Sequence, residues 1–192
     1  MKYKIGIYGS AVEGKEKLTK KALELGTELG KQKNILLITG AGHGIPYLVA
    51  STAARLGIEI WGFPPSTTLE EFKEYMPQAD ISIYSKLFYV PSNFAFIDNI
   101  GACRQYRNLI STANADAGII ISGRWGSMSE FTALREMGKT IGVLTDTGGL
   151  AEELESLTQK FNKESKGKVI FNSSPKELVE KLIGELDKIK LS

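Results

Sequence analysis

The chain has 192 residues, 42% of them hydrophobic, which predicts a single domain (residues 1–192) with a sizeable core. Its 24 basic and 22 acidic residues give a net charge of +2, a balance that argues against a nucleic-acid-binding stripe. The single cysteine, Cys103, excludes an internal disulfide and indicates a reducing compartment. With only one histidine as well, neither a zinc site nor another cofactor is expected.

The amino terminus carries no signal peptide, because its short apolar run continues directly into a strand pattern. No apolar stretch approaches the roughly 20 residues of a membrane span. We therefore expect a cytoplasmic protein whose partners include neither a membrane nor a nucleic acid.

Short apolar runs alternate with longer amphipathic ones along the chain. Strands are predicted at Lys4–Tyr8, Ile35–Thr39, Ile58–Phe63, within Ile81–Val90, and at Ala117–Ile121, Thr140–Leu144 and Lys168–Phe171. Helices are predicted near Glu16–Lys31, Pro46–Leu56, Leu69–Met76, Phe96–Ala113, Ser127–Met137, Ala151–Phe161 and Pro175–Ile189. Strands that are apolar on both faces are typical of a covered parallel sheet. The pattern predicts a Rossmann-like, doubly wound α/β domain with a mostly parallel sheet of about seven strands.

The least regular part of the chain is Pro64–Asn99, which contains four prolines and several aromatic residues. We interpret it as an insertion or an irregular crossover that covers one edge of the functional site.

Three of the predicted strands end in turns rich in glycine. Ligands of doubly wound sheets bind beyond the carboxyl ends of the strands, so we predict that these turns face one ligand. The candidate ligand-binding residues in them are Gly9, Ser10, Gly40, Gly42, Gly44, Gly123, Gly126 and Ser127.

The turn after the strand Ala117–Ile121 is the best phosphate candidate, since a helix that starts after a glycine turn points unpaired N–H groups at an anion. Ser127 has an alternative role as an N-cap, which is compatible with phosphate binding. Trp125 is interpreted either as a packing residue or as a lid over a base.

The turn Gly40–Gly44 does not match a dinucleotide-binding motif, because Ile45 stands where the third glycine would be required. A Walker motif is also absent from the sequence. His43, in the same turn, is interpreted as incidental rather than catalytic, and Cys103 as a buried small apolar residue.

Together with Arg107 and Glu130, these residues resemble the LOG ("lonely guy") phosphoribohydrolases, often labelled lysine decarboxylases, and their molybdenum-cofactor-carrier-like relatives. That family has an arginine on a helix, followed at a fixed distance by P-G-G-x-G-T-x-x-E. Here the corresponding stretch is Ser122–Glu130, and the spacing from Arg107 matches without a gap. The pair Arg107-Asn108 looks like the carrier-like branch, and the resemblance covers roughly Lys4–Gly149.

The motif departs from the family pattern at several positions. Ser122 replaces proline, Arg124 replaces the second glycine, Ser127 replaces threonine, and Ala41 replaces a glycine of the first motif. Arg124 places a long cation where the family brings bare backbone close to the ligand, so it either closes the pocket or adds a phosphate contact.

The resemblance implies hydrolysis of the N-glycosidic bond of a nucleoside 5′-monophosphate, with Arg107 and Glu130 as catalytic residues and Asn108 in the binding site. The alternative is a non-catalytic binder or carrier of a phosphorylated ligand, such as a nucleotide or a molybdopterin-type cofactor. A decarboxylase is disfavoured, since no lysine has a recognisable Schiff-base context. By the same analogy, the chain is expected to form a homodimer or homotetramer with the arginine-bearing helix near the contact.

Overall fold

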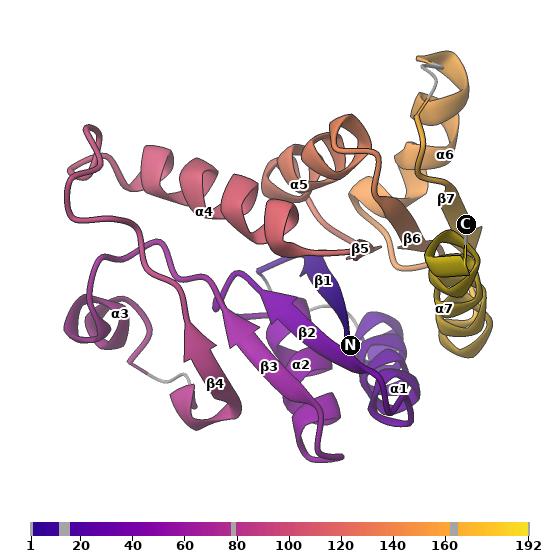
Figure 1. Cartoon of the computed structure of the whole chain (residues 1–192), viewed down its shortest axis with the longest axis horizontal. Coiled ribbons are helices and arrows are strands. Elements are labelled where there is room, and N and C mark those ends of the chain that lie inside the picture. Colours follow the sequence, from indigo (N-terminus) through magenta and orange to yellow (C-terminus); the bar gives the residue numbers. More distant parts are fainter. Residues whose placement is uncertain (1, 12–15, 78–79, 162–164, 192) are drawn as a thin grey trace.

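The computed structural model describes residues 2–11, 16–77, 80–161 and 165–191. Its strands are β1 (Tyr3–Gly9), β2 (Ile35–Thr39), β3 (Glu59–Gly62), β4 (Tyr84–Leu87), β5 (Ala117–Ile121), β6 (Thr140–Leu144) and β7 (Val169–Asn172). They form one sheet in the order β4-β3-β2-β1-β5-β6-β7, in which every neighbouring pair is parallel (Figure 1). This arrangement confirms the predicted Rossmann-like α/β fold.

Helices cover both faces of the sheet. On one face, α1 (Glu16–Gly30), α2 (Ile45–Ala54) and α7 (Pro175–Leu191) pack on the largest apolar core. On the opposite face lie α4 (Ile100–Asn114), α5 (Trp125–Glu136) and α6 (Leu150–Lys160) (Figure 1). A short helix, α3 (Leu69–Tyr75), packs against the turn that follows β2. Since both faces are covered, the central strands are buried along their whole length, as their apolar sequences predicted.

Two helices begin two or more residues away from the predicted start. The helix predicted from Phe96 begins at Ile100, because the Asn99 side chain accepts a hydrogen bond from the Ala102 amide and caps it there. The helix predicted from Ser127 begins already at Trp125, so the N-cap position belongs to Arg124. The N-cap interpretation of Ser127 was therefore wrong.

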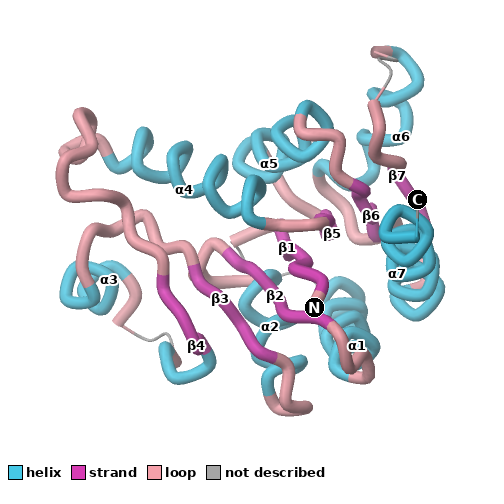
Figure 2. The backbone as a smooth tube through the Cα atoms, in the orientation of Figure 1, coloured by secondary structure: helices cyan, strands magenta, loops and turns pink. Residues whose placement is uncertain are grey.

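The segment Pro64–Asn99 contains regular structure. Its described residues form α3, a 3₁₀ turn η1 (Ile81–Ile83) and the edge strand β4, followed by a long loop over residues 88–99 that leads into α4 (Figure 2). The interpretation as a crossover is the better one, because the segment supplies a strand and then carries the chain to the other face of the sheet.

The strand order reverses between β1 and β5, since the chain builds β1 to β4 outward on one side and β5 to β7 on the other. At such a switch point the loops above neighbouring strands diverge and leave a crevice for a ligand. The turns after β1, β2 and β5 stand at this point.

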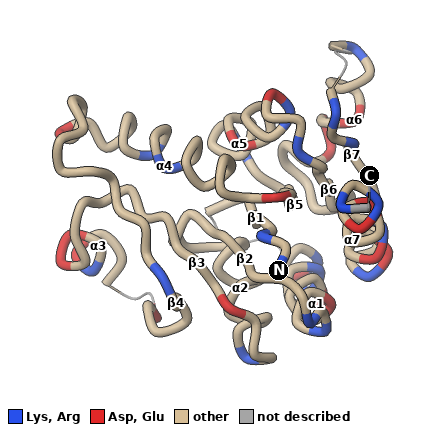
Figure 3. Tube along the Cα trace, in the orientation of Figure 1, with Lys and Arg blue, Asp and Glu red and all other residues tan. Residues whose placement is uncertain are grey.

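Charged side chains are interleaved on the outer helices. Along α7, lysines and glutamates alternate, and exposed lysines form ion pairs with glutamates one turn apart (Figure 3). Such pairs contribute little to stability, and they fit the solvated helix faces predicted from the sequence. Among the described residues, no helix has the length and apolar character needed to cross a bilayer.

Candidate functional site

The three glycine turns adjoin one another at the carboxyl edge of the sheet. Gly9, the last residue of β1, pairs with Ile121, the last residue of β5. On its other side, the Ser10 carbonyl accepts a hydrogen bond of 3.0 Å from the amide of Ile45, at the start of α2. The turn after β1 is therefore held between the other two.

The glycines of these turns fall into two groups. At Gly9 and Gly44 an added Cβ would overlap neighbouring backbone, and at Gly123 it would lie 2.7 Å from the Ser127 side chain. These glycines are required for close packing of the turns. A Cβ at Gly42 or Gly126 would meet no atom within 4 Å, so these two leave open space beside the turns.

Arg107 and Glu130 come together above the turns, from the neighbouring helices α4 and α5. Arg107 Nη1 lies 3.9 Å from Glu130 Oε1, close enough for electrostatic attraction and too far for a hydrogen bond. The two helices are joined beside this pair by a 2.7 Å hydrogen bond from Ser129 Oγ to Gln105 Oε1. The structure thus brings together the two side chains that the sequence singled out as catalytic.

Gly40 determines where the guanidinium lies. The Arg107 side chain reaches from α4 over the end of β2, and a Cβ at Gly40 would overlap Nη1. Only glycine leaves room for the guanidinium at this point of the sheet edge.

The Glu130 carboxyl is buried, with 5% of the residue exposed. Burial raises the pKa of Glu130 to about 7, and the nearby Arg107 guanidinium opposes this rise. A carboxyl group with a pKa near neutrality gains and loses a proton readily under physiological conditions, which is the property required of a general acid or base.

The first turn of α5 presents backbone amides at the edge of this site. An α-helix leaves its first N–H groups without intrahelical partners, here those of Trp125, Gly126 and Ser127. Ser127 is 2% exposed, and its hydroxyl lies against Gly123. Anion binding at this turn would therefore use backbone N–H groups.

Arg124 and Trp125 are both exposed, Trp125 to 86%. The interpretation of Trp125 as a packing residue was therefore wrong. The Arg124 side chain is exposed and is therefore not buried in the site.

The departure from the family motif at Ser122 changes the backbone. Ser122 has a φ of 53°, in the left-handed region, whereas proline is restricted to a φ near −65°. The turn cannot follow the path of one that begins with proline. Its Ser122 amide donates a 2.9 Å hydrogen bond to Thr147 Oγ1, and the amide of Leu150 donates to the Gly123 carbonyl. The turn after β6 thus holds this altered turn in place.

Two tyrosines that the sequence did not single out also belong to this region. Six buried side-chain polar atoms of the described residues have no hydrogen-bond partner, and four of them belong to Tyr8, Tyr84, Arg107 and Asn108. Arg107 acts electrostatically on both tyrosine hydroxyls. Burial raises the pKa of Tyr84 to about 12, so its hydroxyl remains protonated. Buried polar atoms whose hydrogen-bonding capacity is not filled by the protein call for an explanation, such as a bound water or ligand.

Neither His43 nor Cys103 has the character of a catalytic residue. His43 is exposed in the turn after β2, and the buried Cys103 thiol lies 3.3 Å from the Ile97 carbonyl. Burial raises the pKa of that thiol, as expected for a small packing residue. In the described ranges, no three His, Cys, Asp or Glu side chains gather as metal ligands.

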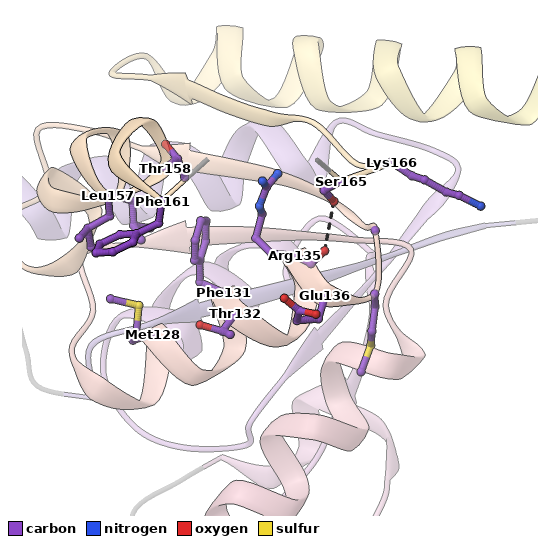
Figure 4. Close-up of a pocket in the computed structure, with 13 residues that line it drawn as sticks. Met128, Phe131, Thr132, Arg135, Glu136, Leu157, Thr158, Phe161, Ser165 and Lys166 are labelled. Atoms are coloured by element: carbon purple, nitrogen blue, oxygen red, sulfur yellow. Dashed lines mark hydrogen bonds between the residues drawn. The ribbon is translucent and has the colours of Figure 1, made fainter. Parts of the chain in front are cut away.

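A cavity of about 680 Å³ lies elsewhere, between α5 and α6. Apolar side chains such as Phe131, Leu157 and Phe161 line it (Figure 4). It contains none of the predicted site residues, because α5 turns Phe131 toward it and Glu130 toward α4. The buried pair of Arg107 and Glu130 thus lies outside this cavity.

Comparisons with known proteins agree with these features. A model of the SLOG cluster4 family, a LOG-like group, matches residues 2–179 and confirms the resemblance drawn from the sequence. No curated protein shows significant sequence similarity to the chain.

Among solved structures, the protein TM1055 is similar with a TM-score of 0.73 and 21% identity, over 96% of this chain and 99% of that one. The molybdenum cofactor binding protein of the phototrophic bacterium Rippkaea orientalis has a TM-score of 0.70 and 18% identity, over 97% and 98% of the two chains. DNA processing protein A of Helicobacter pylori, which binds single-stranded DNA, has a TM-score of 0.65 and 18% identity, over 95% and 81%. At these identities the likeness establishes the fold alone, and the absence of a nucleic-acid partner stays a prediction.

Proposed function

Because the chain belongs to the SLOG cluster4 family, we propose that it hydrolyses the N-glycosidic bond of nucleoside 5′-monophosphates, releasing the free base and ribose 5-phosphate. The observation that carries this proposal is the pair formed by Arg107 and Glu130. The carboxyl group is buried, titrates near neutral pH, and stands 3.9 Å from a cation beside the glycine turns.

In the proposed reaction, the bond between C1′ and the base nitrogen breaks and its electron pair leaves with the base. Positive charge develops on the ribose, where the ionised Glu130 stabilises it, as carboxylates do in glycoside hydrolysis. A water oxygen adds to C1′ while Glu130 accepts its proton, which then passes to the departing base. Arg107 orients Glu130 and holds the leaving base or the phosphate.

The phosphate anchor of this proposal is the start of α5. The amides of Gly126 and Ser127 bind the 5′-phosphate, and the open space beside Gly126 admits it. Gly9, Ser10, Gly42 and Gly44 line the remaining turns. Binding energy gathered at the phosphate aligns the distant N-glycosidic bond with Glu130.

A second candidate function is that of a binding or carrier protein for a phosphorylated ligand, such as a nucleotide or a molybdopterin-type cofactor. Two observations favour it. The turn at Ser122 differs in backbone from one that begins with proline, and a protein of similar fold binds molybdenum cofactor. This alternative needs the anion-binding turn but makes no use of the titrating Glu130.

The experiment that separates the two functions is an assay of free base. The protein is incubated with a panel of nucleoside 5′-monophosphates and with the corresponding nucleosides as phosphate-free controls. We expect base and ribose 5-phosphate in equal amounts from a monophosphate and no base from its nucleoside. Binding of a monophosphate or a pterin phosphate by calorimetry without any base release would instead support the carrier.

We further propose that the chain forms a homodimer or homotetramer through α4 and acts in the cytoplasm. The apolar side chains of Ile100 and Leu109 on this helix are 46% and 49% exposed, and Phe96 before it is 64% exposed. Burial of such side chains against a second copy would be favourable. Light scattering is expected to give at least twice the mass of one chain, and a monomer would contradict this assembly.

A further inference from the structure

The turn after β5 contains two successive residues with positive φ, Ser122 at 53° and Gly123 at 100°. Glycine adopts such a backbone readily, whereas a serine in the left-handed region is uncommon and disfavoured. The conformation of Ser122 is therefore imposed by contacts from outside the turn. Since Ser122 is only 7% exposed, these contacts come from buried neighbours.

The Thr147 hydroxyl supplies one of these contacts. Thr147 lies in the turn after β6 and is 6% exposed. Because a carbonyl can only accept, the 2.6 Å hydrogen bond from Thr147 Oγ1 to the Leu144 carbonyl uses the hydroxyl proton. The same oxygen accepts a hydrogen bond of 2.9 Å from the Ser122 amide. Both roles of the hydroxyl are thus committed, and its orientation is fixed.

The start of α6 supplies the other contacts. The Leu150 amide donates a 3.0 Å hydrogen bond to the Gly123 carbonyl. The Ala151 amide donates a 3.1 Å hydrogen bond to the Ser122 carbonyl. In a trans peptide, the carbonyl of one residue and the N–H of the next point in opposite directions. The amides of Gly123 and Arg124 therefore point away from α6.

The direction away from α6 leads toward the proposed ligand. α6 follows β6, and β6 and β1 lie on opposite sides of β5, at the point where the strand order reverses (Figure 1). Within the described part of the chain, neither the Gly123 amide nor the Arg124 amide donates a hydrogen bond. These two amides extend the row of unpaired N–H groups at the start of α5.

We propose that Thr147 is a positioning residue for the phosphate anchor. Its hydroxyl holds the Ser122 amide, and with it the left-handed turn whose following amides face the ligand. Thr147 itself does not contact the ligand, because its hydroxyl is already committed on both sides. The role rests on the proposed phosphate site at the start of α5, whether the phosphorylated ligand is hydrolysed or only carried.

The turn after β6 is also held independently of this hydroxyl. Glu152 Oε1 accepts hydrogen bonds from the amides of Thr147, at 2.9 Å, and Gly148, at 3.0 Å. These contacts, like those from the start of α6, use backbone amides and persist when the Thr147 side chain is changed. A substitution at Thr147 therefore removes the hold on the Ser122 amide and leaves the turn that carries it in place.

The test is Thr147→Val, which replaces the hydroxyl by a methyl group of similar size. Its matched control is Thr140→Val, because Thr140 on β6 is 2% exposed and its hydroxyl has no hydrogen-bond partner among the described residues. Calorimetry measures the binding of ribose 5-phosphate, with ribose as the phosphate-free probe. We expect Thr147→Val to bind ribose 5-phosphate about tenfold more weakly than the wild type. Thr140→Val should match the wild type, and Thr147→Ser, which keeps the hydroxyl, should recover most of the affinity.

Equal affinities of Thr147→Val and the wild type, or equal losses in Thr147→Val and Thr140→Val, would overturn the proposal. A wild type that binds no ribose 5-phosphate would overturn it too, since there would be no anchor to position. A merely structural hydroxyl would lower the thermal unfolding midpoint and leave the affinity of the folded protein unchanged. If Thr147→Val is too unstable to purify, the same comparison is made in Ser122→Gly, where glycine accepts the left-handed backbone and keeps the amide that Thr147 holds.

Failure of this role is distinguishable from failure of the hydrolase. If the wild type releases base, Thr147→Val should raise KM for the monophosphate and leave the pH profile in place, because Arg107 and Glu130 are unchanged. Binding that depends on Thr147 without any base release would support the positioning role and reject the hydrolase. Base release and binding that are both indifferent to Thr147→Val would support the hydrolase and reject the positioning role.

Discussion

Replacement of Glu130 by glutamine is expected to lower the rate of base release by about 10²–10⁴-fold, the usual effect of losing a general acid or base. Glutamine has nearly the same shape, so the packing between α4 and α5 persists and binding of the monophosphate should change little. The amide cannot accept a proton from water, and it carries no negative charge to stabilise the ribose cation. Steady-state kinetics with the best monophosphate substrate measure the effect, which should fall on kcat rather than KM.

The matched control for this variant is Glu136→Gln on the same helix. Glu136 is exposed and lines the cavity between α5 and α6, not the site beside Arg107. Its replacement removes an equal charge and should leave the rate unchanged. Equal rates in Glu130→Gln and the wild type would refute the catalytic role of Glu130, while equal losses in the two variants would indicate a general charge effect.

The same substitution has a second expected consequence, on stability. The folded pKa of Glu130 of about 7 exceeds its ordinary value of 4.5, so folding favours the neutral form. The stability that this group contributes is therefore fully present below pH 4.5 and is lost as the pH rises through 7. The difference corresponds to about 3 kcal/mol. Urea unfolding at about pH 5 and about pH 8 should show this loss in the wild type and a smaller loss in Glu130→Gln.

Much of the fold could be predicted because its central strands are unambiguous in sequence. The strands β2, β5 and β6 begin and end at the predicted residues. Each is a run of apolar residues bounded by turn-forming ones, and burial on both faces leaves no competing pattern. The start of α4 was predicted too early, because the apolar residues that precede Ile100, from Phe96 onward, extend the helical pattern toward the amino terminus. Asn99 caps the helix and sets its actual start.

The candidate site could be predicted only in part. Arg107 and Glu130 were found through a motif, and their approach to 3.9 Å depends on how α4 packs on α5, which no local pattern encodes. Tyr8 gave no signal, since a tyrosine within an apolar strand is typical of a core residue. Its ring lies against Gly118 in another strand, more than 100 positions along the chain.

Gly40→Ala is expected to reduce kcat/KM by about 10²-fold although neither catalytic residue is replaced, the cost of misplacing a catalytic group by about 1 Å. The new Cβ would overlap Nη1 of Arg107, so the guanidinium must move away from the end of β2. The overlapping atoms are the end of a flexible side chain, so the free energy of unfolding should change little. Steady-state kinetics and urea unfolding measure the two effects separately.

Gly42→Ala provides the control in the same turn. Gly42 has no positive φ, and its added Cβ meets nothing within 4 Å. The variant therefore makes the same glycine-to-alanine change without a new contact to Arg107. Because Arg107 lowers the pKa of Glu130, its displacement should move the pH profile of Gly40→Ala upward and leave that of Gly42→Ala in place. Were both variants to lose activity equally with unchanged profiles, the turn would act on the ligand directly. The role of Gly40 in seating the guanidinium would then be wrong.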